Sequence, residues 1–246
     1  MRNLAFTVAL LLLPLTVSAQ GGPPGLSLGA GLVLSDSAYR GSGSRFIPIP
    51  AVRYESESLY LLGLEAGLHV FTAERWQADV FASGRLDGAD DIQLPGIASE
   101  VERDDAIDIG GRLTYRSGST SVAATLKRDA LGVSDGAELG IKASRVFAVG
   151  RGFITPSLGV RLLNARLADY YFGTLANEVA AGAAIYRPGS ASIVEIGVTG
   201  LRPLQGGRWA LFSQVTFGQL SDQLSDSPLL DSDTTGAFIA GATYQF

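Results

Sequence analysis

The sequence predicts an all-β fold, a transmembrane antiparallel β-barrel of about 12 strands, with about 10 as the alternative count. The chain closes with a segment that places Phe238, Ala240, Tyr244 and Phe246 on one face of an extended strand and small or polar residues on the other. It begins with the pattern of a secretory signal. Between these two features no apolar run reaches the about 20 residues that a membrane-spanning helix needs.

Residues 1–19 form the expected signal peptide, and residues 20–246 form the expected barrel domain. After a basic start, an apolar run extends from Leu4 to Leu15, and Val17-Ser18-Ala19 supplies the small residues of a cleavage site. The alternative interpretation is an N-terminal membrane anchor, but this run is too short to span a bilayer.

Charge and composition narrow the function. The chain has a formal net charge of −5 and no cluster of Lys or Arg, which excludes nucleic-acid binding, because phosphate contacts need basic residues on one face. Its lack of Cys excludes a lipid anchor at a processed cysteine. The terminal Phe246 is the expected assembly signal, read by the outer-membrane assembly machinery. We therefore expect the cell outer membrane of a Gram-negative bacterium, with outer-membrane lipid as solvent.

Each expected strand alternates apolar residues with polar or small ones, as a strand between lipid and lumen requires. The candidate strands run through residues 26–34, 46–54, 62–70, 76–85, 107–115, 122–126, 139–143, 154–162, 179–185, 194–198, 209–217 and 238–246. A soluble β-sandwich also alternates and is the alternative fold. It would not favour a terminal Phe or such Gly- and Ala-rich faces.

The charged residues in the central parts of these segments all lie on the face assigned to the lumen. Lipid-facing Arg or Lys would cost about 2–4 kcal/mol at the membrane midplane. Several of these groups are of opposite sign and could pair across the interior, which would plug a narrow barrel. The candidate lumen residues are Arg53, Glu65, His69, Asp79, Arg85, Arg112, Lys142 and Glu195.

The connections conflict with this strand count. Residues 116–119, 149–152 and 187–190 read as tight turns from their Gly and Pro content. The longer connections span residues 87–105, 129–136, 164–177 and 201–208. Barrels keep short turns on the periplasmic side, yet counting back from a periplasmic Phe246 places these tight turns outside. Either a strand is miscounted, or the long segments fold into the lumen or periplasm.

Several short motifs carry a resemblance to a known family. In order along the chain they are Gly29-Ala30-Gly31, Tyr39-Arg40-Gly41-Ser42, Ile47-Pro48-Ile49-Pro50, Asp169-Tyr170-Tyr171-Phe172-Gly173, Asp226-Ser227-Pro228-Leu229-Leu230 and Tyr244-Gln245-Phe246. The order and spacing resemble the MipA/OmpV family of outer-membrane proteins over essentially the whole mature chain. Phe172 departs from the family pattern, in which Gly directly follows the paired tyrosines.

The resemblance implies a non-catalytic role. It implies a scaffold that brings a lytic transglycosylase together with a peptidoglycan synthase at the outer membrane. Other members of the family imply adhesion, osmotic adaptation or antibiotic response. The candidate interaction residues taken from the motifs are Tyr39, Gly41, Pro48, Pro50, Asp169, Tyr170, Tyr171, Gly173, Ser227 and Pro228.

The motif residues also have structural interpretations. Because a closed barrel has no edge, Pro48 and Pro50 are expected at a strand start or bulge; otherwise they form a rigid recognition segment. Tyr170 and Tyr171 are expected in an interfacial aromatic girdle, with a contact surface for a partner as the alternative. Ser227-Pro228 is expected to end a loop before the last strand.

The sequence gives little support for a catalytic, metal-binding or cofactor-binding site. His69 is the only histidine, on the same predicted face as Glu65, and a lone luminal histidine is more often a structural hydrogen-bonding group than a catalytic one. Three functions remain as hypotheses. They are a scaffold for peptidoglycan-remodelling enzymes, a narrow small-solute pore lined by the luminal charges, and an adhesin or stress-response protein that presents acidic loops outward.

Overall fold

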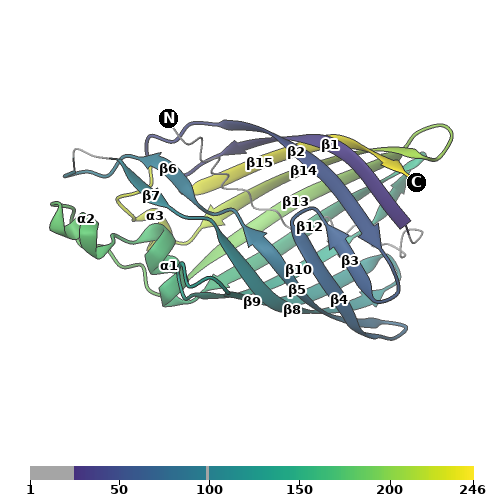
Figure 1. Ribbon diagram of the computed structural model, residues 1–246, viewed down its shortest axis with the longest axis horizontal. Coiled ribbons are helices and arrows are strands. Elements are labelled where there is room, and N and C mark those ends of the chain that lie inside the picture. Colours follow the sequence, from purple (N-terminus) through teal and green to yellow (C-terminus); the bar gives the residue numbers. More distant parts are fainter. Residues whose placement is uncertain (1–24, 98–99) are drawn as a thin grey trace.

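The computed structural model describes residues 25–97 and 100–246, and the expected signal peptide lies outside the described residues. The molecule is a barrel of long antiparallel strands, with short helices gathered at one end (Figure 1). Among the described residues, no helix is both long and apolar enough to cross a membrane.

Twelve antiparallel strands form the closed ring, because β15 pairs with β1 and β10 pairs with β12. In ring order these are β1 (Gly25–Asp36), β2 (Arg45–Glu55), β3 (Leu59–Leu62), β4 (Glu65–Thr72), β5 (Trp76–Arg85), β8 (Ala106–Ser117), β9 (Thr120–Asp129), β10 (Ala137–Arg145), β12 (Gly152–Leu163), β13 (Ala191–Pro203), β14 (Trp209–Leu220) and β15 (Thr234–Gln245). The short β11 (Phe147–Val149) continues the line of β10 along β12. The fold class predicted from the sequence is confirmed.

Alternation along each strand separates the two faces of the wall. In β1, Leu28, Leu32 and Leu34 are exposed on the outer surface, whereas Val33 is fully buried on the inner side. β9 and β10 alternate in the same way between exposed apolar residues and partly buried polar or small ones. The apolar outer surface satisfies the requirement of a hydrocarbon solvent, and pairing around the ring satisfies most of the backbone groups of the strands.

The two ends of the barrel differ in their connections. Short turns join the strands at the end where Phe246 lies, whereas long segments join them at the opposite end, which carries all three helices (Figure 1). We call these the turn end and the loop end. The loop end holds β6 (Ala89–Ile92), β7 (Val101–Arg103), α1 (Ala165–Phe172), α2 (Ala176–Ala180) and α3 (Asp222–Ser225). In outer-membrane barrels the turn end faces the periplasm.

Two of the predicted strands are wrong, one because it is absent and one because it is really two strands, so the total of twelve is unchanged. The same two errors explain why the tight turns are predicted on the outer side. The predicted strand at 179–185 is wrong, because this segment contains the end of α2 and irregular chain. The predicted strand at 62–70 is in fact a hairpin, since the chain turns back at Gly63, which has φ +57°, and divides β3 from β4. With these corrections the turns at 118–119 and 150–151 lie at the turn end.

Two other predicted connections also change. Residues 187–190 do not join two strands but end the long loop-end segment that leads into β13. The predicted long connection at 201–208 is in fact a short turn of residues 204–208, because β13 extends to Pro203 and β14 starts at Trp209. Every long segment therefore lies on one side of the barrel and every short turn on the other, except the turn at residues 63–64, which lies within the wall and points toward the loop end.

The expectation for the proline pair is wrong as well. Pro48 and Pro50 lie inside β2, neither at its start nor at a bulge, and pair in regular register with β1. On its other side, β2 pairs with β3 only over Arg53–Glu55. The part of β2 nearer the loop end is therefore an edge strand on this side, and edge strands are where a sheet tolerates proline.

Candidate functional site

The long segments of the loop end form a cap with an apolar core of its own. Its buried side chains come from distant parts of the chain. They include Tyr39, Ile92, Val101, Leu167, Tyr171, Leu224, Leu229 and Leu230. Because apolar burial contributes about 25 cal/mol per Å², this cluster holds the segments together as a lid rather than as separate loops.

Hydrogen bonds between the motif residues hold the cap in one arrangement. The hydroxyl of Tyr39 donates to the carbonyl oxygen of Tyr171 at 3.0 Å, and the hydroxyl of Tyr171 donates to the carbonyl oxygen of Asp104 at 3.1 Å. Ser227 Oγ donates to the carbonyl oxygen of Phe172. Burial raises the pKa of both Tyr39 and Tyr171 well above the ordinary value for tyrosine. Both hydroxyls therefore stay protonated and able to donate.

A buried ion pair lies at the centre of the cap. Arg103 Nη1 lies 2.6 Å from Glu178 Oε1, and both side chains are almost completely buried. Arg103 also donates to the carbonyl oxygens of Tyr170 and Gly173, at 2.6 Å and 2.9 Å. One guanidinium thus ties β7 to α1, to the residue after α1, and to α2. Sequence reasoning missed this pair, because a loop Arg belongs to no periodic face.

The remaining motif residues serve the same structure. Arg40 donates to the carbonyl oxygens of Pro228 and Leu230, at 3.4 Å and 2.8 Å. Gly41 has φ +80°, which favours glycine, and lies against the side chain of Gln93. Asp169 Oδ1 accepts a hydrogen bond from the backbone N–H of Gly189.

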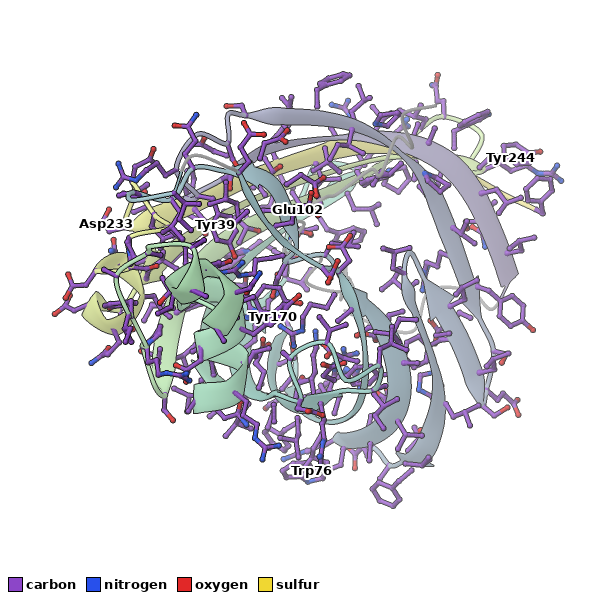
Figure 2. All side chains as sticks on the ribbon, turned by 60° about the vertical axis from the view of Figure 1, so that its left-hand side comes forward. Tyr39, Trp76, Glu102, Tyr170, Asp233 and Tyr244 are labelled. Atoms are coloured by element: carbon purple, nitrogen blue, oxygen red, sulfur yellow. The ribbon has the colours of Figure 1, made fainter. Side chains whose placement is uncertain are left out.

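Eight of the ten candidate interaction residues therefore meet in the cap, and the other two are the prolines of β2. Figure 2 shows Tyr39 and Tyr170 on the side of the helices, and Tyr244 at the opposite side. The girdle interpretation is wrong for Tyr171, which is buried in the cap core, whereas Tyr170 is half-buried. The role of these residues in binding a partner stays a prediction.

Ion pairs fill the inner side of one wall. Arg85 lies 2.7 Å from Asp108 and 3.1 Å from Glu138, and Arg161 lies 2.7 Å from the same Glu138 carboxylate. Arg161 also reaches Glu195 at 3.5 Å. These residues come from β5, β8, β10, β12 and β13, so the pairs cross several strands. Lys142 lies on the inner side of β10 and is partly buried.

A second group occupies the neighbouring strands. Arg112 binds Glu65 through two hydrogen bonds of 2.9 Å and 2.8 Å, and Tyr60 donates to Glu65 at 2.7 Å. Sequence reasoning assigned Glu65 and Arg112 to the lumen and missed Tyr60. Arg53, the remaining predicted lumen residue, is about one-third exposed and lies 3.7 Å from Glu55.

His69 is enclosed by carboxylates. Its Nδ1 lies 2.6 Å from Asp79 and its Nε2 lies 3.0 Å from Glu55, while its ring stacks on Tyr60 with centroids 5.0 Å apart. Glu65, on the same face, binds Arg112 and Tyr60 instead. Because both ring nitrogens face carboxylates, neither is free to act as a general base for a nucleophile. Within the described ranges, no group of three acidic or His residues could hold a metal ion.

The turn end carries a different set of side chains. Trp76 and Tyr115 pack with ring centroids 4.8 Å apart, as do Trp209 and Tyr244 at 5.2 Å, in the manner of an interfacial aromatic girdle. Phe246 is 71% exposed beside Tyr244. Arginines surround this end, and we call them the rim arginines: Arg75, Arg116, Arg145, Arg151, Arg202 and Arg208.

Comparisons with known proteins match the chain to a family model and to curated outer-membrane relatives. The family model described as MltA-interacting protein MipA matches residues 28–246. YiaT of Escherichia coli O157:H7, whose name describes an outer membrane protein, is 27% identical over 97% of each chain. The MltA-interacting protein of Escherichia coli K12 is 23% identical over 89% of this chain and 90% of its own. The solved structure of Vibrio cholerae OmpT covers 90% of this chain and 97% of its own, with 9% identity and a TM-score of 0.38.

Proposed function

Because the chain belongs to the MltA-interacting protein (MipA) family of outer-membrane proteins, we propose that it is an interaction protein that holds a periplasmic cell-wall enzyme at the outer membrane. The family resemblance and the outer-membrane location expected from the sequence are confirmed. One relative is named for its interaction with MltA. By analogy, the proposed partner of this chain is a lytic transglycosylase, and a peptidoglycan synthase is the second member of the assembly.

The rim arginines are the observation that supports the proposal best. They surround the end that faces the periplasm, where the acidic residues in or beside the turns are Glu55, Glu57 and Glu74. Arg75, Arg151 and Arg202 are exposed. A basic rim of this kind attracts an acidic protein surface, and complementary charge raises the association rate and fixes the orientation of the complex.

The position of the motif residues in the cap supports a structural role for them, in holding the fold together, rather than direct contact with the enzyme. They lie at the end opposite the rim, and several are buried. The cap and the luminal ion pairs also oppose the alternative of a narrow axial pore. The adhesin or stress-response role stays a prediction, supported only by the acidic composition of the loop end.

Capture of the partner tests the proposal. The full-length protein in lipid nanodiscs is mixed with a lytic transglycosylase from the same bacterium, and binding is measured by surface plasmon resonance at low salt. We expect the triple variant Arg75→Glu/Arg151→Glu/Arg202→Glu to lose most of the binding, because charge reversal opposes an acidic partner.

A matched variant at the loop end controls for total charge. Arg128, Arg166 and Arg187 are also exposed, so Arg128→Glu/Arg166→Glu/Arg187→Glu changes net charge by the same amount at the other end. We expect it to bind as the wild type does. Equal binding by the rim variant and the wild type would contradict the proposed surface, and failure of the wild type to bind would contradict the proposed function.

A further inference from the structure

The ring of strands has one stretch where a strand lacks a neighbour. β2 pairs with β1 along its whole length, but the β3–β4 hairpin meets β2 only over Arg53–Glu55 before the chain turns at Gly63. On the far side, the backbone N–H of Gly84 near the end of β5 donates to the carbonyl oxygen of Leu64 in this turn. Toward the loop end, residues 46–51 of β2 therefore have no ladder on the β5 side among the described strands. Figure 1 shows the short β3 between β2 and β5. We call this stretch the notch.

Two prolines remove two of the three backbone hydrogen-bond donors on the notch edge. The carbonyl oxygen of Val52 accepts from Gly63, so even-numbered residues of β2 direct their backbone groups toward this side. Pro48 and Pro50 have the same parity, and each lacks a backbone N–H. Two of the three donors that residues 46–51 would direct into the notch are therefore missing, Phe46 keeps its N–H there, and β2 keeps its full ladder with β1.

A third proline supports this interpretation. Pro156 of β12 lies opposite Arg145, where the ladder between β12 and its neighbour breaks between β10 and β11. Its missing donor also coincides with a missing ladder bond. There, however, strands continue on both sides of the break, whereas at the notch the neighbouring strand itself has ended.

The proline edge selects what can occupy the notch. A strand from another chain would need backbone donors on this edge, and proline is a common means of preventing such pairing. Contact with hydrocarbon instead favours an edge with few unsatisfied backbone groups, since each such group in lipid costs several kcal/mol. The two prolines therefore lower the cost of placing this edge beside an apolar neighbour, although its carbonyl oxygens and the Phe46 N–H remain, and they make the edge a poor template for a strand.

Both faces of β2 beside the notch are apolar. Phe46 is 63% exposed on the outer face, which it shares with both prolines. On the inner face, Ile47 and Ile49 are partly buried and pack against a cluster formed by Val33, Phe212 and Ile239. This apolar side of the lumen belongs to β1, β2, β14 and β15. The opposite side carries the ion pairs of β5, β8, β10 and β12.

The notch offers a route from the side. The cap covers the barrel at the loop end, which lies toward the outer leaflet. Leu86 also packs against the apolar cluster, so the lumen is narrow at this level. We propose that the notch is a lateral opening through which a hydrocarbon chain passes between the outer leaflet and the apolar side of the lumen. The chain belongs either to a membrane lipid or to a free apolar solute.

Quenching of tryptophan by brominated hydrocarbon tests this proposal. The native tryptophans lie at the turn end, so a Trp76→Phe/Trp209→Phe background removes them. Ile49→Trp then reports from the lumen beside the notch. The variant is reconstituted in phosphatidylcholine vesicles with either ordinary or brominated acyl chains, and we expect brominated lipid to quench Trp fluorescence nearly as strongly as in the lipid-facing Phe46→Trp reference.

A lumen control accounts for quenching through the wall. Ala123 lies on the inner side of β9, within the closed part of the ring, and Ala123→Trp should lose little fluorescence. A second reporter, Ile47→Trp, covers the case in which Ile49→Trp fails to fold, as judged by heat-modifiable gel mobility. If the notch reporters are quenched no more than Ala123→Trp, the lateral opening is wrong.

The source of the chain is distinguished in a second arm. Ordinary vesicles receive a brominated alkane, so that only a free apolar solute carries the quencher. Quenching of Ile49→Trp by brominated phospholipid supports entry of lipid chains, and quenching by the alkane alone supports entry of a free solute. Quenching by neither overturns the proposal and leaves the proposed function at the rim untouched.

Discussion

The two ends of the barrel are built from the same strands but differ in packing and in charge. At the loop end, long segments bury an apolar core and an ion pair. At the turn end, the connections are too short to bury a core, and their side chains are mostly exposed. The loop-end segments are rich in acidic residues, whereas the turn end carries the rim arginines.

This difference separates the residues of the predicted family motifs from the residues that could bind in the periplasm. The motifs carried by the loops gather in the cap, where Tyr39, Tyr171 and Ser227 bind one another's segments. The rim arginines belong to none of these motifs. Resemblance to a family therefore reports the construction of the cap, while the proposed enzyme contact depends on residues that the motifs do not mark.

Breaking the ion pair of the cap should have the largest effect of the changes considered, because it should unfold structure at the loop end and leave the turn end intact. Arg103→Ala leaves the buried Glu178 carboxylate without its partner, which costs about 3–5 kcal/mol in comparable sites. We expect the cap to open while the barrel wall stays folded. Protease cleavage of the loop segments in intact cells measures opening, and heat-modifiable gel mobility measures the wall.

An exposed pair on the same side provides the control. Arg187 is 69% exposed and lies 3.9 Å from Asp169, and exposed pairs contribute about 0–1 kcal/mol. Arg187→Ala should therefore leave the cap resistant to protease. Equal cleavage of the two variants would show that the buried pair does not hold the cap closed.

Alkaline pH should have a smaller effect, and again only at the loop end. Burial raises the pKa of Tyr39 and Tyr171 in the folded cap, so folding favours the protonated form. The resulting stability is complete below about pH 10, the pKa of unfolded tyrosine, and is lost as pH rises further. We expect protease sensitivity of the cap to increase above that pH while the wall persists.

Phenylalanine variants separate the tyrosines from general alkaline damage. Tyr39→Phe removes the hydroxyl that donates to Tyr171, at a cost of about 0.5–1.5 kcal/mol. Tyr39→Phe/Tyr171→Phe should shift cap opening to higher pH, because fewer buried groups ionise. An unchanged midpoint of opening in the double variant would mean that other groups control the transition.

The wall could be predicted from the sequence because lipid imposes a strict period of two on each strand. The predicted segments failed where that signal is short or ambiguous. β3 has only four residues, too few for a clear alternation. Residues 179–185 alternate Val, Ala and Ile, but alanine is also a good helix former, and this segment contains the end of α2.

The cap could not be predicted, because its contacts join segments far apart in the chain. Arg103 and Glu178 lie 75 positions apart, and Tyr39 and Tyr171 lie 132 positions apart. No local period brings such residues together. Pro48 and Pro50 are unusual in a closed barrel, and the structure explains them by the short β3–β4 hairpin, which leaves part of β2 without a neighbour. Interpretation of residues 62–70 as a single strand hides that hairpin.

The smallest expected effect belongs to single rim arginines. Arg151 lies in a short turn and is exposed, so its charge acts across solvent, where screening is strong beyond about 8 Å at physiological ionic strength. Arg151→Gln should weaken capture of the lytic transglycosylase only a few-fold, chiefly through a slower association rate. Added salt should then weaken the wild type more than the variant, because the wild type has more charge to screen. Arg166→Gln at the loop end should leave both the rate and its salt dependence unchanged. If Arg151→Gln instead abolished binding at every salt concentration, the contact would be a local one, and a diffuse basic rim would be the wrong description.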